Sequence, residues 1–146
     1  MEKIIFEEHL YFGVHDSFVT VCNDLGSKDK VRLSVYDSNH NELCSHIAST
    51  KDNFYEEDYA RILANSHGIL DEGSFIKIGY KFKLSCGVIV ECVVCGDRVS
   101  IYSETEHKVA NTPFVDVEGL KKYVCKNFGS VKSNDITEKD MQYIVC

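Results

Sequence analysis

The clearest pattern in the chain is a strict alternation of apolar and polar residues over 75–86, FIKIGYKFKLSC. Apolar residues occupy the even positions from Ile76 to Cys86, while lysine, glycine or serine occupies the odd positions from 77 to 85. Successive side chains of a β-strand point to opposite faces. The pattern therefore predicts a strand with one apolar and one solvated face, as in an antiparallel sheet covered on one side.

Shorter runs predict further strands. Residues 31–37 alternate through Val31, Leu33 and Val35, and the polar segment DSNH separates them from residues 41–48. Because asparagine, aspartate and serine favour turns, these two runs predict a hairpin. Further strands are predicted at 17–22 and 88–95, and one long strand from residue 98 that fades into polar residues by 110.

Residues 53–68 carry the signals of an inserted helix. Asn53 is a candidate N-cap, Glu56 follows it three residues later, and Gly68 stands near the end. The predicted apolar face consists of Tyr55, Tyr59, Ile62 and Leu63.

A second helix is predicted over 116–129, with Asp116 as its N-cap and Gly129 at its end. Its apolar stripe would consist of Val117, Leu120, Val124 and Phe128. Many antiparallel strands with few helices favour a mostly β chain, or β-rich α+β. We expect an antiparallel β-sandwich with one inserted helix in a single domain over residues 1–130, and a C-terminal helical tail over 131–146.

Composition narrows the classes of function. A chain of 146 residues with 44% hydrophobic and 27% charged residues is an ordinary globular chain. The net charge of −7 argues against a nucleic-acid partner, since no basic stripe could contact several phosphates. No apolar run approaches the ~18 residues of a membrane helix. The N-terminus does not resemble a signal peptide, so we expect a reducing compartment, cytoplasmic or nuclear, and no membrane partner.

The segment CVVCGD, residues 92–97, raises the question of a metal or redox site. A structural zinc site needs four ligands, usually in two close pairs, and no second Cys-x-x-Cys occurs. Strand alternation also places positions i and i+3 on opposite faces. We expect both sulfurs to fill space in a buried strand and the seven cysteines to form no disulfide framework. A small zinc-binding protein using Cys92 and Cys95 is the alternative.

No local signature of catalysis is present among the six histidines and seven cysteines. Each histidine is expected on the surface or in a loop, and the carboxylates of YEEDY are expected to be solvated. We therefore expect no enzyme, no catalytic residue, no metal and no cofactor.

What the sequence favours is an interaction module that recognises a protein or peptide, with a second copy of the chain as a further partner. Exposed strand edges and aromatic side chains would supply the contacts. The candidate partner-binding residues are Tyr11, Phe12, Phe54, Tyr55, Tyr59 and Tyr102. Core packing is the competing interpretation at each of them.

Residues 31–84 resemble the later half of the TRAF-like MATH domain family. In that family a strand hairpin is followed by a short helical segment and then by an alternating strand, and HGILDEGSFIKIGYKFKL stands in the place of the last two. The chain has no tryptophan, which the family usually carries. The resemblance implies a β-sandwich that recognises a partner peptide, as an adaptor does. The alternative context is a virus-encoded β-sandwich factor that binds and neutralises a host protein.

Overall fold

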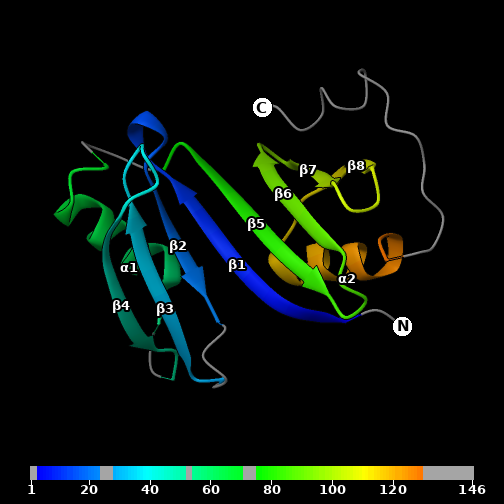
Figure 1. Cartoon of the computed structure of the whole chain (residues 1–146), viewed down its shortest axis with the longest axis horizontal. Helices are drawn as coiled ribbons and strands as arrows, with labels where there is room; N and C mark the ends of the chain where they lie inside the picture. Colours follow the sequence, from blue (N-terminus) through cyan, green and yellow to red (C-terminus); the bar gives the residue numbers. More distant parts are fainter. Residues whose placement is uncertain (1–2, 24–27, 52–53, 71–74, 130–146) are drawn as a thin grey trace. The chain divides into compact units, whose positions relative to one another are not determined.

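The computed structural model describes residues 3–23, 28–51, 54–70 and 75–129. These residues form strands and helices in the following order along the chain (Figure 1): β1 (Ile4–Phe12), the 3-10 turn η1 (Val14–Asp16), β2 (Phe18–Cys22), β3 (Lys30–Tyr36), β4 (Glu42–Ser49), α1 (Glu56–Ser66), β5 (Lys77–Leu84), β6 (Ile89–Cys95), β7 (Arg98–Ser103), β8 (Lys108–Pro113) and α2 (Val117–Asn127).

The strands form one antiparallel sheet in the order β4-β3-β2-β1-β5-β6-β7-β8. The expected β-rich α+β chain of antiparallel strands, with one inserted helix and a helix near the C-terminal end, is thereby confirmed. The hydrogen bonding differs from the expected sandwich in one respect. It joins every described strand into a single sheet and does not divide them between two.

Two strand predictions need correction. β1 was not expected, because its sequence IIFEEHLYF has no clean alternation. The single strand expected from residue 98 to 110 is two strands, β7 and β8, joined by a turn in which His107 has a left-handed backbone (φ 49°). A short hairpin of this kind often needs a positive φ in its turn.

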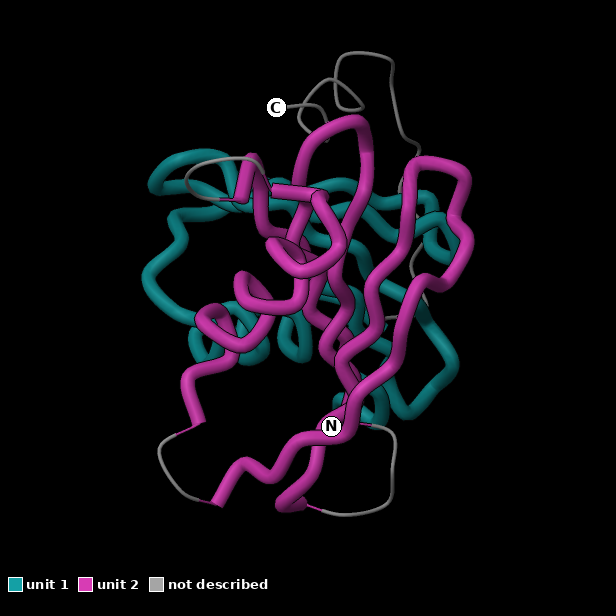
Figure 2. Tube along the Cα trace, turned by 90° about the vertical axis from the view of Figure 1, so that its left-hand side faces the viewer, with its two compact units in different colours: residues 1–7, 80–146 teal, residues 8–79 magenta. Residues whose placement is uncertain are grey.

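The chain divides into two compact units (Figure 2). Unit 2 is residues 8–79, and unit 1 combines residues 1–7 with 80–146. β1 and β5 each contribute residues to both units. The expected single domain over 1–130 stays a prediction, and the expected helical tail over 131–146 lies outside the described residues.

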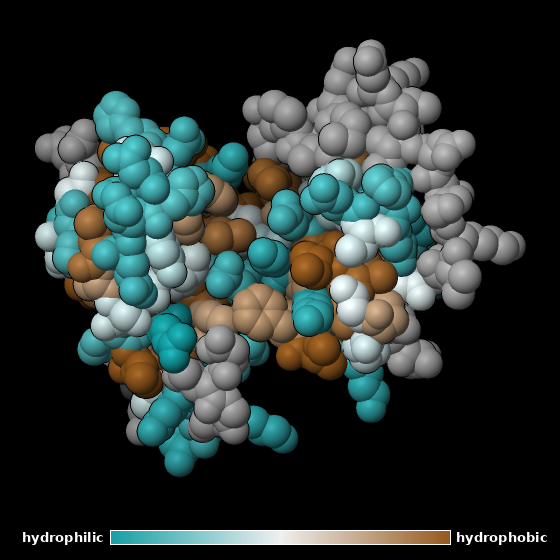
Figure 3. Space-filling view, in the orientation of Figure 1, coloured by the Kyte–Doolittle hydropathy of each residue, from teal (hydrophilic) through white to brown (hydrophobic). Residues whose placement is uncertain are grey.

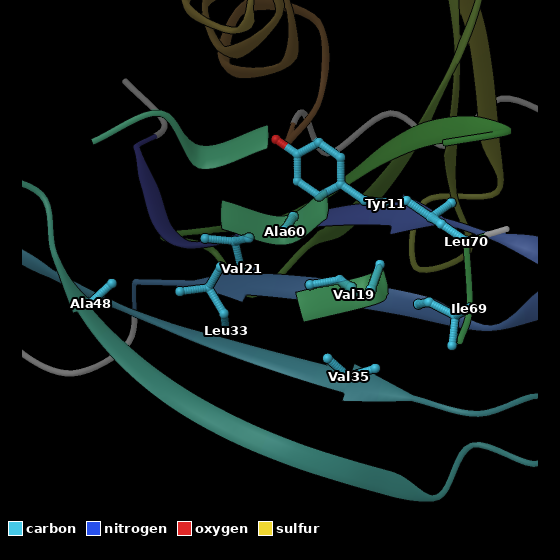
Figure 4. Packing of buried hydrophobic residues seen from close by; sticks show 10 residues of the cluster. Tyr11, Val19, Val21, Leu33, Val35, Ala48, Ala60, Ile69 and Leu70 are labelled. Atoms are coloured by element: carbon cyan, nitrogen blue, oxygen red, sulfur yellow. The ribbon is translucent and has the colours of Figure 1, made fainter. Parts of the chain in front are cut away.

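In unit 2, α1 packs on β2 and β3. The core is a cluster of apolar side chains from the strands, from α1 and from the segment that follows α1 (Figure 4). Its fully or nearly fully buried members are Tyr11, Val19, Val21, Leu33, Val35, Ala48, Ala60, Ala64, Ile69 and Leu70. The members from β2 and β3 alternate along their strands, so the helix covers one face of the sheet.

The opposite face of unit 2 carries a row of aromatic rings. Phe12, Phe18 and Tyr36 are direct partners across β1, β2 and β3, with ring centroids 5.7 and 5.0 Å apart. His40 meets the outer edge of the row at 5.5 Å, and the Lys77 ammonium lies 4.7 Å from the Phe12 ring centre. The rings are half-buried, so the row stabilises the sheet by cross-strand contacts.

The hairpin expected between 31–37 and 41–48 is confirmed as β3 and β4. Its turn is built around Asp37, whose Oδ1 accepts hydrogen bonds from the backbone N–H groups of Asn39 (2.9 Å) and Asn41 (3.0 Å). The bond from Asn41 is the main reason why the pKa of this exposed carboxyl is lowered. This turn sets where β4 begins.

In unit 1, α2 has the predicted cap and the predicted stripe. The Asp116 carboxylate accepts a hydrogen bond from the Gly119 N–H at 2.7 Å, and the helix buries Leu120, Val124 and, just after its end, Phe128. An N-cap side chain satisfies a backbone donor that the first helical turn leaves unpaired.

The C-terminal end of α2 is held by the β7–β8 turn and β8. The Lys108 ammonium donates to the Asn127 carbonyl, and the Gly129 N–H donates to the buried Glu106 carboxylate. These contacts satisfy backbone groups at a helix end, where partners are otherwise missing.

Candidate partner-binding surface

Helix α1 leaves its largest apolar side chains in solvent. Tyr55 is 65% exposed, Tyr59 39% and Ile62 63%. They stand at positions i, i+4 and i+7, so they lie along one side of the helix. We call these three residues the α1 stripe. Exposed apolar groups arranged in this way are typical of contact surfaces more than of solvated helices.

The prediction for this helix was wrong at its N-terminus. Tyr55, with no capping hydrogen bond from its side chain, is the N-cap, and the expected cap Asn53 lies outside the described residues. Core packing was the competing interpretation of Tyr55 and Tyr59, but the side chains of the helix that are fully buried are those of Ala60 and Ala64. Small side chains let the helix backbone approach the sheet closely, which turns the tyrosines outward.

The ring of Phe54 supports the exposed stripe. Phe54 is half-buried against the core of unit 2, and its ring centre lies 5.0 Å from that of Tyr59. A tilted aromatic pair at this distance is favourable by about 0.5–1.5 kcal/mol beyond its buried area. Tyr59 is therefore held in place on the surface by the half-buried ring of Phe54, which lowers the conformational entropy that Tyr59 loses when a partner binds.

The first residue of α1 is fixed to β1. Glu56 Oε2 lies 2.6 Å from His9 Nδ1 and also accepts the hydroxyl hydrogen bond of Tyr11. Since a carboxylate only accepts, His9 must donate through Nδ1. His9 and Glu56 are only 14% and 24% exposed, which corrects the expectation of a surface histidine and a solvated carboxylate. Tyr11 is 5% exposed, so this candidate positions the helix and does not contact a partner.

Replacing Glu56 with glutamine should lower the free energy of unfolding by about 1–2 kcal/mol, because a charged acceptor shared by two donors becomes a neutral one. Urea denaturation followed by circular dichroism measures this change. Glu57→Gln is the matched control: Glu57 is 48% exposed and 3.5 Å from Arg61, so its loss should cost less than about 0.5 kcal/mol. Equal losses in the two variants would contradict the positioning role of Glu56.

The surface beside the stripe is acidic. Glu57 and Asp58 are 48% and 63% exposed in the first turn of α1, where negative charge favours the helix. Arg61 is the basic group near them, at 3.5 and 3.4 Å. A partner that covers the α1 stripe would therefore meet apolar side chains bordered by carboxylates.

The remaining candidates lie elsewhere. Phe12 belongs to the aromatic row of unit 2, on the face opposite α1. Tyr102 is half-buried on β7 and lines a cavity of about 600 Å³ in unit 1, together with Lys81, Ile89, Glu91, Glu104 and His107. This size suits a small ligand. Three of its seven lining residues, Lys81, Glu91 and Glu104, are charged. The structure thus brings together Phe54, Tyr55 and Tyr59 alone among the six candidates.

On the face of the molecule that Figure 3 shows, brown apolar side chains occur in separate groups among hydrophilic ones. The contacts of a partner with such a surface depend on a few anchoring residues, which is the usual distribution of binding energy.

The cysteines of CVVC are not equivalent. Cys92 is 2% exposed, and burial, with a smaller contribution from the charge of Glu91, raises the pKa of its thiol. Cys95 is disulfide-bonded, so the expectation that both sulfurs only fill space in a buried strand is wrong for Cys95. A zinc site needs thiolates, and neither sulfur is suited to supply one. Among the described residues, no group of three or more His, Cys, Asp or Glu side chains could hold a metal ion.

Comparison with known proteins found no matching family model, curated protein or solved structure. The resemblance of residues 31–84 to the MATH family therefore stays a prediction. Within the described residues, neither helix is long and apolar enough to cross a membrane.

Proposed function

We propose that this chain is a noncatalytic protein-interaction module whose partner contacts the α1 stripe. The observation that carries the proposal is the exposure of Tyr55, Tyr59 and Ile62 on one side of a helix whose opposite side is buried through alanines. Tyrosine is enriched at interfaces because it offers a large apolar ring with a polar end. The partner would present an apolar groove with a basic rim, matching the carboxylates of Glu57 and Asp58.

Two contexts fit such a module: an adaptor of the MATH type, and a virus-encoded factor that neutralises a host protein. Recovery of a ubiquitin-ligase scaffold would favour the adaptor. Recovery of an immune effector would favour the viral factor.

Ile62→Lys should abolish partner binding, because it places a charge in the centre of an apolar contact. Truncating an interface anchor typically weakens binding by about 30-fold or more. The experiment compares the proteins recovered with the tagged wild-type chain and with the variant, followed by titration of the recovered partner. Tyr59→Ala should weaken binding of the same partner without introducing a charge.

Ile76→Lys is the matched control, since Ile76 is 68% exposed in the same unit but lies outside α1. Binding should survive this change. A partner that is retained by Ile62→Lys and Tyr59→Ala, or lost equally with Ile76→Lys, would contradict the proposed surface.

A further inference from the structure

β4 is the outermost strand at one end of the sheet, beyond β3. Thr50, just after β4, donates its N–H to the Asp29 carbonyl at 2.7 Å, on the β3 side. The N–H and C=O groups of a strand point to alternate sides from one residue to the next. Ser45, Ile47 and Ser49 therefore point their backbone groups away from β3. Within the described part of the chain, no strand pairs with that outer side.

The regular part of β4 begins at Cys44. Val35 pairs with Cys44, but the next residue of β3, Tyr36, pairs with Glu42, so Leu43 is an extra residue on β4. A bulge of this kind interrupts a strand locally. From Cys44 to Ser49 the strand keeps a constant register with β3 and can accept another strand.

The usual protections of an edge strand are missing from the regular part of β4, residues 44–49. Its sequence CSHIAS contains no lysine, arginine, aspartate, glutamate or proline, and the side chain of Ile47 is 55% exposed. Native proteins normally protect an edge with charged side chains, proline or a covering element.

The opposite edge strand, β8, has such a protection. Phe114 donates its N–H to Asp97 at 2.8 Å, on the β7 side, so the odd-numbered residues of β8 point outward. One of them is Pro113, which has no N–H to donate. The two edges of the sheet therefore differ. Every outward-pointing residue of β4 has both a backbone N–H donor and a C=O acceptor, whereas Pro113 on β8 has only the acceptor.

We propose that the chain forms a homodimer in which β4 pairs antiparallel with β4 of a second copy, with the two-fold axis at Ile47. The outward backbone groups of Ile47 then meet those of its symmetry mate, and Ser45 meets Ser49 on each side of the axis. This pairing makes about six new backbone hydrogen bonds. It also brings the two exposed Ile47 side chains together as a cross-strand apolar pair.

A second copy fits this edge because the strand is complementary to itself. An isologous interface requires that each residue face a compatible residue of the same strand. In this register Lys51, 66% exposed beyond the end of β4, lies beside Glu42, which begins β4 in the other copy. The acidic start of β4 in one copy therefore meets the basic residue after the end of β4 in the other. Lys51 also lies 3.6 Å from Asp29 of its own copy. His46 faces Ala48, and between Cys44 and Thr50 no like charges oppose each other.

Sedimentation equilibrium tests the dimer. The wild-type chain of 16.6 kDa should approach about 33 kDa as its concentration rises over about 1–100 µM. Ile47→Lys places two ammonium groups at the axis and should weaken the dimer at least about tenfold. Ser45→Pro removes an outward N–H and leaves the backbone hydrogen bonds to β3 intact, although it loses the hydrogen bond that Ser34 Oγ donates to Ser45 Oγ at 3.3 Å. It should weaken the dimer similarly. Circular dichroism establishes that each variant is folded.

Ile76→Lys is the matched control, because Ile76 is 68% exposed in the same unit but lies outside β4, and this variant should dimerise like the wild type. In hydrogen exchange, the amides of Ser45, Ile47 and Ser49 should become protected as the dimer forms. A wild-type chain that stays monomeric over the whole range would overturn the proposal. So would a dimer that both β4 variants leave unchanged, or one that Ile76→Lys alone abolishes.

Discussion

Replacing Phe82 with alanine is expected to lower the free energy of unfolding by about 3–5 kcal/mol. Phe82 is fully buried in unit 1, and its ring lies parallel to that of Tyr80, with centroids 6.1 Å apart. The change removes a large apolar side chain and leaves a cavity that the neighbouring strands can fill only in part. Since the free energy of unfolding of a domain is typically about 5–15 kcal/mol, this single change removes a large share of the total stability.

Urea denaturation followed by circular dichroism measures the loss. Ile89→Ala is the control, because Ile89 lies on β6 of the same unit and is 36% exposed. It should cost less than about 1.5 kcal/mol, since a partly solvated side chain has less apolar surface to lose. A loss in Phe82→Ala no larger than in the control would show that unit 1 is packed differently.

Gly13→Ala should cost about 3 kcal/mol, because no space exists for the added methyl group. A Cβ atom at Gly13 would lie 2.3 Å from the backbone oxygen of Ile69 and 3.2 Å from its carbon. That carbonyl is not a flexible side-chain end: it accepts the Val14 N–H at 3.0 Å. The contact ties the segment after α1 to the end of β1, so its loss should also loosen the helix that carries the α1 stripe.

The control for Gly13→Ala is Gly96→Ala in the β6–β7 turn. Gly96 has φ +64° with nothing within 4 Å of an added Cβ, so alanine there should cost only about 1–2 kcal/mol for the left-handed backbone. Thermal denaturation of both variants separates steric clash from backbone strain. If Gly13→Ala is the milder change of the two, the close approach to Ile69 is not present in solution.

Periodicity predicted the strands whose two faces differ in polarity. β5 was evident because Phe82 and Leu84 alternate with lysines, and the solvated face of the sheet keeps that contrast. β1 could not be recognised in this way. Its acidic residues and His9 interrupt the alternation of apolar and polar positions. His9 can be half-buried because its ring is hydrogen-bonded to Glu56, a residue 47 positions away in the chain. A partner so distant leaves no local signal.

The candidate surface was predicted in composition but not in orientation. The sequence identified Tyr55, Tyr59 and Ile62 as neighbours on one side of a helix, and this is correct. Hydrophobicity alone left partner contact and core packing as competing interpretations of that side, and the structure buries Ala60 and Ala64 instead. The volume of the side chains decided which side of the helix faces the sheet, because the space between helix and sheet admits only methyl groups. A pattern of apolar residues along the chain does not reveal how wide that space is.

The division of unit 1 between residues 1–7 and 80–146 has a consequence for biosynthesis. The N-terminal residues of β1 leave the ribosome before unit 2, yet the rest of their own unit follows only after roughly 70 further residues, about 4–15 s later at ordinary rates of translation. Unit 2 is contiguous and can assemble during that delay. The order in which the nascent chain emerges thus favours closure of unit 2 before that of unit 1.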